Sequence, residues 1–370
     1  MNVLLTCAGR RSYLVQFFQR ALGRRGRVIA CDSSGSAPAL READQRFIVP
    51  KIDHPDYFAE LLAICKKHAV RLLFSSNDLE LTGLSQQAAR FHALGTIPVV
   101  ASPQAIAICQ DKWATFHWLR ACGLDTPDTY LSLADAGAAV GQGALAFPLL
   151  IKPRFGTSSI GVELVENDRE LALAYEWVQV QLRRTILARW PQAEAVGSLV
   201  IQPFIQGPEY GMDIVNDLSG RHVCTLARRK LVMRSGNTDR AVTVSEPGLE
   251  RVGAVIGQNL AHLGSLDCDV IRTERGYSVL DLNPRFGGGY PFSHLAGANL
   301  PAALIAWAKG KEPDPAWLRT TPGITSSKYD GVTIVDQDAP MPAIDAATTI
   351  AVVPPLPLAP GPLTETGAAS

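Results

Sequence analysis

The pattern Asp281-x-Asn283-x-Arg285 holds the side chains with the clearest chemistry in this 370-residue chain. Residues 277–280 before it are apolar and β-prone, so we expect a strand to deliver the pattern. Residues two apart on a strand face the same way, which brings the oxygens of Asp281 and Asn283 together. Oxygen ligands suit Mg²⁺, and the fork of Arg285 suits a phosphate. The spacing therefore predicts a magnesium and phosphate site; an edge strand ending in an ordinary glycine-rich turn is the alternative.

A hairpin should add a third oxygen ligand to this site. Residues 266–271 form another β-prone run, and the glycine-containing turn at 274–276 can pair it with the strand that follows. That pairing places Asp269 beside Asp281. We therefore expect Asp269, Asp281 and Asn283 to meet at one point.

Composition limits the partners of the protein. Lys plus Arg equals Asp plus Glu at 35 each, so no global field attracts nucleic acid or an anionic membrane. The seven cysteines include no C-x-x-C pair, which argues against a zinc site or a disulfide framework and favours a reducing compartment. The N-terminus has no signal-peptide pattern, and no apolar run reaches the roughly 18 residues of a membrane helix. We expect a cytoplasmic protein that binds small molecules, with neither nucleic acid nor membrane as a partner.

The N-terminal third alternates strand and helix patterns. Short apolar runs end near residues 6, 31, 50 and 74, and helical periodicity covers 13–22 and 57–67. This order predicts a Rossmann-like α/β domain that closes near residue 108. Only Gly9 stands where a dinucleotide fingerprint needs three glycines, so NAD binding is not expected.

Two polar groups in this domain have open roles. Arg10 and Arg11 stand at the entrance of the first helix, where they could hold an anionic substrate group or simply be solvated. Asn77, Asp78 and Glu80 follow the strand that ends near residue 74, at the sheet edge where α/β ligands usually lie. These three could touch substrate, but capping of the next helix is the favoured interpretation.

A lysine-bearing strand and a glycine loop follow. On the 147–153 strand, Lys152 faces away from its apolar neighbours Leu149 and Ile151. The loop at 154–162 is rich in glycine and hydroxyl residues, whose backbone N–H groups can meet a polyphosphate. It is not a Walker A loop, because no Gly-Lys-Ser/Thr sequence opens a helix there.

Further strands carry charged pairs on single faces. Glu209 and Asp213 share one face of a strand, and Arg228 and Lys230 share one face of the next. This second pair could hold a triphosphate or a carboxylate, or it could be solvated. His294 is interpreted as a packing residue of a helix rather than as a base.

Several motifs in a fixed order resemble the ATP-grasp superfamily. They are Asp111-Lys112, then Lys152-Pro153-Arg154 with its Gly-Ser loop, then Gln202-Pro203-Phe204, then Asp281-x-Asn283-Pro284-Arg285. Within that superfamily the chain is most similar to the carbamoyl-phosphate-synthase-like, single-copy ATP-grasp ligases, over residues 1–310.

The resemblance implies an α/β plus α+β architecture. A Rossmann-like pre-ATP-grasp domain at 1–108 would precede a two-subdomain ATP-grasp domain at 109–310. Beyond the part that resembles the family, we expect residues 311–335 to form a small C-terminal appendage. The prolines and small residues that follow predict a Pro-rich disordered tail at 336–370.

The resemblance also implies that ATP binds between the two subdomains. The loop at 156–161 would fold over the phosphates and close as a lid, residues near 202–205 would form the hinge against adenine, and Glu209 would accept from the ribose hydroxyls. Mg²⁺, or alternatively Mn²⁺, would be held by Asp269, Asp281 and Asn283. Arg285, Lys152 and Lys230 are the expected catalytic residues. The expected nucleotide contacts are Lys112, Lys152, Gly156, Thr157, Ser158, Ser159, Gly161, Gln202, Phe204, Ile205 and Glu209.

Two positions depart from the family pattern. Asp281 stands where the family more often has Glu, which shortens the reach to the metal. Gln202 replaces a frequent acidic hinge residue, so we expect its side chain to contact adenine differently.

The implied reaction is a ligation. ATP would phosphorylate a substrate carboxylate, and an amine would displace phosphate from the acyl phosphate to give an amide or peptide-like bond. Amino-acid-like substrates and a homodimer are further expectations from the family. The alternatives are a carboxylate or bicarbonate kinase of the carbamoyl-phosphate-synthase type and a non-catalytic ATP-binding regulatory module.

Overall fold

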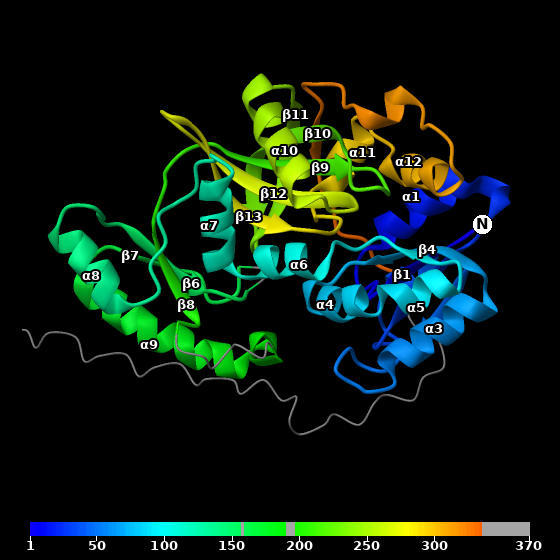
Figure 1. Ribbon diagram of the computed structural model, residues 1–370, viewed down its shortest axis with the longest axis horizontal. Helices are drawn as coiled ribbons and strands as arrows, with labels where there is room; N and C mark the ends of the chain where they lie inside the picture. Colours follow the sequence, from blue (N-terminus) through cyan, green and yellow to red (C-terminus); the bar gives the residue numbers. More distant parts are fainter. Residues whose placement is uncertain (157–158, 190–196, 335–370) are drawn as a thin grey trace, which may run out of the picture. The chain divides into compact units, whose positions relative to one another are not determined.

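The computed structural model describes residues 1–156, 159–189 and 197–334, which contain three β-sheets (Figure 1). The disordered tail expected at 336–370 lies outside the described residues. The α/β plus α+β class expected from the sequence is confirmed, because one sheet is parallel and the other two are antiparallel.

The N-terminal sheet is parallel, with strand order β3-β2-β1-β4-β5. The third strand ends at Ile48, two residues before the predicted end near residue 50, because Pro50 has no N–H for the ladder. The strands are β1 (Asn2–Thr6), β2 (Val28–Asp32), β3 (Gln45–Ile48), β4 (Val70–Ser75) and β5 (Ile97–Pro98). The helices are α1 (Ser12–Leu22), α2 (Ala39–Glu42), α3 (Tyr57–Lys67), α4 (Asp78–Gln86), α5 (Ala88–Ala93) and α6 (Pro103–Gln110), with a 3₁₀ turn at Gly23–Arg25.

A small antiparallel sheet with order β7-β6-β8 forms the next layer. Helix α7 (Lys112–Ala121) precedes it, and α8 (Leu133–Gly141) and α9 (Asp168–Arg184) bury apolar residues against one of its faces. The strands are β6 (Leu149–Pro153), β7 (Glu163–Val165) and β8 (Leu199–Pro203), and a 3₁₀ turn covers Ile186–Arg189. Leu149 and Ile151 point into this core, so Lys152 faces the other way, as predicted.

The large sheet is antiparallel, with order β13-β12-β9-β10-β11-β14. Helix α10 (Pro247–Leu260) covers one face with apolar residues, and charged side chains gather on the other. The strands are β9 (Glu209–Asn216), β10 (His222–Arg234), β11 (Asn237–Val244), β12 (Gly264–Thr273), β13 (Gly276–Asn283) and β14 (Thr325–Ser327). The last of these, in the stretch expected as an appendage, pairs with β11 and so extends the sheet.

Two short helices connect the large sheet to the N-terminal one. They are α11 (Tyr290–Leu295) and α12 (Leu300–Ala308), and a 3₁₀ turn at Pro315–Leu318 follows them. Leu300 and Leu304 of α12 share an apolar core with Phe18 of α1, and Phe286 joins the same core. The segment after the Asp281 pattern is therefore packed against the N-terminal domain.

Helix α10 packs so closely that glycine is required on its inner face. A Cβ atom at Gly253 would come within 2.1 Å of Thr225 Oγ1 on β10. Gly253→Ala should therefore lower the free energy of unfolding by about 1–3 kcal/mol through overpacking, as measured by urea titration. Gly137→Ala on α8 is the control: its Cβ meets nothing within 4 Å, so it should raise stability by about 0.5–1 kcal/mol. Equal stability of the two variants would contradict this packing.

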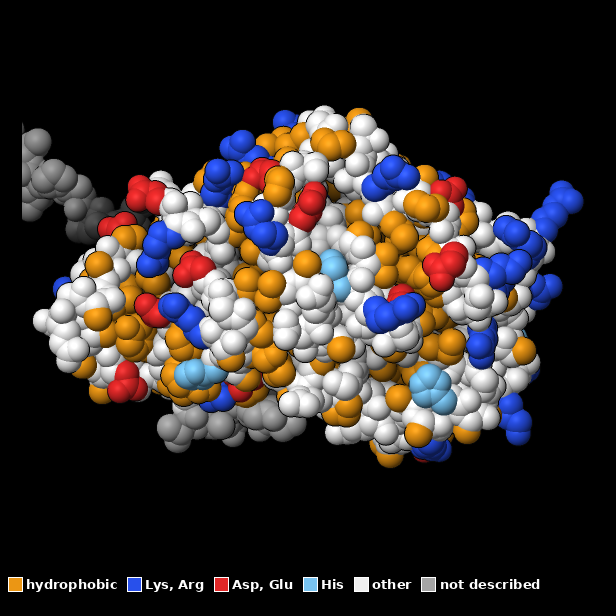
Figure 2. All heavy atoms as spheres, turned by 45° about the horizontal axis from the view of Figure 1, so that its top comes forward, with side chains coloured by type: hydrophobic (Ala, Val, Ile, Leu, Met, Phe, Trp, Pro, Cys, Tyr) orange, Lys and Arg blue, Asp and Glu red, His pale blue; other side chains and the backbone are white. Residues whose placement is uncertain are grey.

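Side chains of both charges are mixed on one face of the molecule. Figure 2 shows basic, acidic and apolar side chains interspersed across the middle of one face, with more of the basic ones toward its right end. Within the described ranges, no helix is both long enough and apolar enough to cross a bilayer.

Candidate functional site

The β12–β13 hairpin brings the expected oxygen ligands together. Asp269 and Asp281 are direct cross-strand partners, and Asp267 is the partner of Asn283. The amide of Asn283 donates to Asp281 Oδ2 at 3.3 Å, so these two side chains share a face as the spacing predicted. The described residues contain no group of three or more His, Cys, Asp or Glu side chains that could hold a metal ion. The set of Asp269, Asp281 and Asn283 does not form such a group, because it offers two carboxylates and one amide oxygen.

Two lysines contact these carboxylates. Lys230 Nζ lies 2.8 Å from Asp269 Oδ1 and 3.5 Å from Glu209 Oε2, and its side chain is only 8% exposed. Burial lowers the pKa of Lys230, but the carboxylates of Asp269 and Glu209 outweigh burial, so its pKa lies above the usual value. Lys112 Nζ lies 3.7 Å from Asp281 Oδ1 and donates to the carbonyl of Gly156 at 3.2 Å. The ammonium groups thus approach the carboxylates where a metal cation would be expected.

Lys152 is a third lysine near these carboxylates, and their negative charge offsets its burial only in part. Burial, followed by the charge of Lys112, lowers its pKa to about 8, and the carboxylates of Asp281 and Asp269 only partly oppose this. Leu150, two residues before it, lies on the same face, and Leu164 pairs with Leu150 from β7. Leu164 is 50% exposed. A half-buried apolar surface therefore lies beside the Lys152 ammonium, and sequence reasoning missed it because Leu150 and Leu164 look like ordinary core residues.

The glycine loop is fixed at its start. Arg154 donates twice to the Asp111 carboxylate, from Nε and Nη2, both at 2.6 Å. This fork attaches the loop to the N-cap of α7, the residue before Lys112. Gly161 has a positive φ of 72°, and a Cβ there would approach Pro153 to 3.1 Å. Gly156, Ser159 and Gly161 are placed by the structure, whereas Thr157 and Ser158 lie outside the described residues.

The expected hinge residues have protein partners. Gln202 is buried and donates from Nε2 to Thr129 Oγ1 at 2.8 Å. The backbone N–H of Phe204 donates to the carbonyl of Pro148, and the residue as a whole is 40% exposed. Ile205 follows in the half-buried part of the segment. Their contacts with adenine, and that of Glu209 with ribose, remain predictions.

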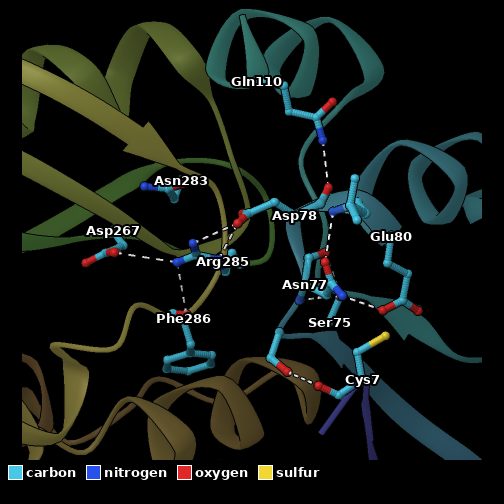
Figure 3. Close-up of polar contacts among 12 residues, drawn as sticks. Cys7, Ser75, Asn77, Asp78, Glu80, Gln110, Asp267, Asn283, Arg285 and Phe286 are labelled. Carbon is cyan, nitrogen blue, oxygen red and sulfur yellow. Dashed lines mark hydrogen bonds and ion pairs between the residues drawn. The ribbon is translucent and has the colours of Figure 1, made fainter. Parts of the chain in front are cut away.

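Arg285 is clamped by the N-terminal domain, as Figure 3 shows. Its Nε and Nη2 atoms lie 2.9 Å from the two carboxylate oxygens of Asp78, and Nη1 lies 3.5 Å from Asp267 Oδ2. Gln110 supports this contact by donating to the Asp78 carbonyl at 2.7 Å. Burial lowers the pKa of Arg285, but Asp78 and Asp267 outweigh it and hold the guanidinium charged. The fork expected to be available for phosphate is thus largely used by Asp78, a partner that sequence reasoning missed.

The other two residues of the 77–80 group are structural. Asn77 Oδ1 accepts from the Leu79 N–H at 3.0 Å, which confirms the capping interpretation for that residue. Glu80 is fully buried and accepts hydrogen bonds from Thr6, Ser75 and Tyr57. Burial raises its pKa, and these hydroxyl donors oppose the rise.

Arg228 is buried in an ion-pair network, so the solvated alternative is wrong for it and for Lys230. Its guanidinium is 2.6 Å from Asp213 Oδ2 and 3.2 Å from Asp267 Oδ1. Gly211 gives it room, because a Cβ there would come within 3.1 Å of the guanidinium. The sequence predicted which neighbour on its own strand shares a face with Arg228 and with Asp213. It did not predict the ion pair between these two residues, which lie on different strands.

His294 is a packing residue, as interpreted from the sequence. Its ring stacks on Phe17 with centroids 3.6 Å apart, and its Nδ1 lies 3.1 Å from the Tyr290 hydroxyl. Burial, with a smaller contribution from Arg20, lowers its pKa to about 4.

A small pocket opens between the hairpin and the N-terminal half of the chain. The pocket is bordered by the glycine loop, the start of α4 and the end of α6. Its lining residues are Asp78, Cys109, Gln110, Gly156, Leu282, Asn283 and Pro284.

Two family models match the chain. Residues 3–100 match the family described as "PylC-like, N-terminal domain", and residues 195–331 match "ATP-grasp in the biosynthetic pathway with Ter operon". Among curated proteins, a D-alanine–D-alanine ligase of Marinobacter nauticus is 27% identical over 192 residues, covering 51% of this chain and 50% of that enzyme. The chain thus spans about half of that relative's length, and only 33% of a Nitrosomonas europaea relative with the same description.

Solved structures share the fold. A biotin carboxylase of Campylobacter jejuni, in complex with β-γ-ATP, superposes with a TM-score of 0.66 at 16% identity, covering 86% of this chain and 73% of that chain. An N5-carboxyaminoimidazole synthetase of Staphylococcus aureus, complexed with ADP, gives a TM-score of 0.62 at 14% identity, covering 88% and 79%. Together with the two family models, these likenesses confirm the expected arrangement of an α/β domain followed by an ATP-grasp fold.

Proposed function

Because the chain belongs to the ATP-grasp superfamily, we propose that it is an ATP-dependent ligase that joins a carboxylate to an amine through an acyl phosphate. The observation that carries the proposal is the cross-strand pair of Asp269 and Asp281, joined by Asn283 and approached by lysines from separate elements. The relatives described as D-alanine–D-alanine ligases support amino-acid-like substrates.

The residues present fit ATP and Mg²⁺. Magnesium is usually held by one or two carboxylates together with substrate phosphates rather than by an all-protein cage, and Asp269, Asp281 and Asn283 make such a partial set. Lys152, with its lowered pKa, would gain from an anionic partner. The apolar surface of Leu150 and Leu164 beside it fits an adenine or ribose face.

Each residue then has a defined task in the reaction. When bound, Mg²⁺ would neutralise charge on the transferred phosphoryl group. Lys112, Lys152 and Lys230 would hold the phosphates, and Arg285 would add a fixed positive charge from its place between Asp78 and Asp267. The γ-phosphoryl group would pass to a substrate carboxylate oxygen, releasing ADP. The amine lone pair would then attack the acyl carbon, phosphate would leave with the bonding electrons, and the amine would lose a proton.

The test is ADP release with Mg²⁺-ATP against amino acids, supplied singly and in pairs, with bicarbonate as a further substrate. A ligase should need a pair and yield a condensed product. ADP release that needs only a carboxylate or bicarbonate would favour the kinase alternative. A melting temperature raised by ATP without any ADP release would favour the regulatory module.

Nucleotide binding should take up protons through Lys152. Its pKa of about 8 leaves about half of it uncharged at pH 8, and nearby phosphates should restore the charge. The affinity for ADP should therefore fall as pH rises above 8, and binding at pH 8 should take up about half a proton. Calorimetry in two buffers of different ionisation enthalpy measures this uptake. Lys152→Arg, which is always charged, should bind without uptake; uptake that persists in this variant would contradict the assignment.

The remaining expectations from the sequence belong to the same proposal. We infer domain boundaries near residues 108 and 310, with 311–335 as a small C-terminal appendage whose strand β14 extends the large sheet. We also infer that the protein is a cytoplasmic homodimer and that its partners are small molecules only. Size-exclusion chromatography with light scattering tests the dimer.

A further inference from the structure

Four cationic side chains surround the glycine loop at 287–289, directly after Arg285. The Phe286 carbonyl accepts from Arg11 Nη1 at 3.2 Å and from Arg285 Nη1 at 3.4 Å. A Cβ atom at Gly288 would lie 3.7 Å from Lys328 Nζ, and one at Gly289 would lie 2.0 Å from the Arg228 guanidinium. Residues from both ends of the sequence thus bring positive charge to one loop.

Only two of these four cations have carboxylate partners. Arg228 is paired with Asp213 and Asp267, and Arg285 with Asp78 and Asp267. Among the described residues, the ion pairs include neither Arg11 nor Lys328. The loop therefore has two cations whose charge is not matched by a direct protein contact.

The Arg11 guanidinium has more N–H donors than it has hydrogen bonds to described residues. Its three contacts are the carbonyls of Phe286 and Ser76 and the hydroxyl of Tyr13. A guanidinium has five N–H donors, so two have no acceptor in the described part of the chain. Arg11 is also the N-cap of α1, whose first turn has no acidic residue and no side-chain cap, and such a terminus favours an anion.

Lys328 is half-buried, and the charges of its neighbours act on its ammonium group. Its Nζ lies 5.7 Å from the centre of the Phe292 ring. Burial lowers its pKa, the charges of Arg228 and Arg11 lower it further, and Asp239 and Asp267 oppose them. Lys328 and Arg11 therefore both border the loop at 287–289, Arg11 through the Phe286 carbonyl and Lys328 beside Gly288.

We propose that Arg11 and Lys328 bind the carboxylate of the amine substrate, so that this substrate is an α-amino acid. This inference rests on the proposed ligase function and adds the class of the acceptor. The loop at 287–289 begins two residues beyond Arg285, so a carboxylate held there lies next to the phosphoryl-transfer residues. An amine group one carbon away would then be directed toward the acyl phosphate.

The test compares amino acids with their carboxamides, which keep the amine and lose the negative charge. For the wild-type protein, the amide of the preferred acceptor should give a kcat/KM about 10- to 100-fold lower than that of the acid, mainly through KM. Lys328→Gln should lower kcat/KM for the acid by a similar factor and leave the amide nearly unchanged. Lys309→Gln, the same change at an exposed lysine, is the matched control and should behave as wild type. Arg11→Gln should act like Lys328→Gln.

A second measurement separates this inference from the ligase proposal. Calorimetry with Mg²⁺ and a non-hydrolysable ATP analogue measures acceptor binding without turnover, over the same acids and amides. Tighter binding of acids that is lost in Lys328→Gln supports the subsite even if ADP release fails to depend on an amine. Equal binding of acid and amide, no binding of any acid, or wild-type behaviour of Lys328→Gln would overturn the subsite while leaving the ligase proposal to its own assay.

Discussion

Asp281→Asn should lower the rate of ADP release on the order of 10²- to 10³-fold, because the change removes one of the two carboxylates in the proposed Asp269, Asp281 and Asn283 metal set. The substitution keeps the size of the side chain and its hydrogen-bonding reach to Asn283. Its effect should therefore appear in kcat and in the Mg²⁺ concentration that gives half-maximal rate, with little change in melting temperature.

The control for this change is Asp281→Glu. It keeps the charge and restores the residue that the family more often has, so it should retain activity within about tenfold. Steady-state kinetics over a range of Mg²⁺ concentrations decides the matter. Wild-type kinetics for Asp281→Asn would remove Asp281 from the metal site, and an inactive Asp281→Glu would show that the shorter reach is required.

Arg228→Met should cost about 3–5 kcal/mol of folding stability, because it leaves the buried Asp213 carboxylate without its cation. Asp213 is fully buried, and the remaining hydrogen bond to its Oδ2 comes from Ser293 at 2.6 Å. The double variant Arg228→Met/Asp213→Asn removes the uncompensated charge and should recover much of the loss. Urea unfolding of the single and double variants measures both effects.

The loss of stability should also depend on pH. Burial raises the pKa of Asp213, and Arg228 opposes that rise, so removing Arg228 should raise this pKa further. A folded-state pKa above the unfolded value means that stability is retained below the unfolded pKa and lost as pH rises through the folded pKa. The deficit of Arg228→Met should therefore shrink as pH falls from 8 to about 5. A deficit that is constant with pH would mean that lost packing, rather than a buried charge, causes the instability.

Sequence patterns were sufficient where the interacting residues are close in the chain. Asp269 and Asp281 belong to one hairpin, so strand alternation and one tight turn predicted their contact. The orientation of Lys152 followed from the alternation of its own strand. The pairing of Arg285 with Asp78 could not be predicted in this way, because it depends on how two domains dock. Charged residues on a strand give the same pattern whether they are solvated or paired across a sheet, which is why the burial of Arg228 was not predicted.

Helix α10 was not predicted for a different reason. Glycine lowers helix propensity by about 1 kcal/mol per residue, and α10 contains Gly248, Gly253 and Gly257. A Cβ at the second and third of these would meet side chains of β10 at 2.1 and 2.4 Å. The residues that weaken the helical pattern are those that allow the helix to approach the sheet.

The contact between Arg285 and Asp78 has a consequence for biosynthesis, because 207 positions separate the two residues. At translation rates of about 5–20 residues per second, Asp78 leaves the ribosome roughly 10–40 s before its guanidinium partner. Glu80, by contrast, takes its hydrogen bonds from Thr6, Tyr57 and Ser75, which are all synthesised before it. The nascent N-terminal domain can therefore bury Glu80 at once, while the surface around Asp78 and Arg11 waits for the last quarter of the chain, and a ribosome stall in that interval would expose it to chaperones and proteases.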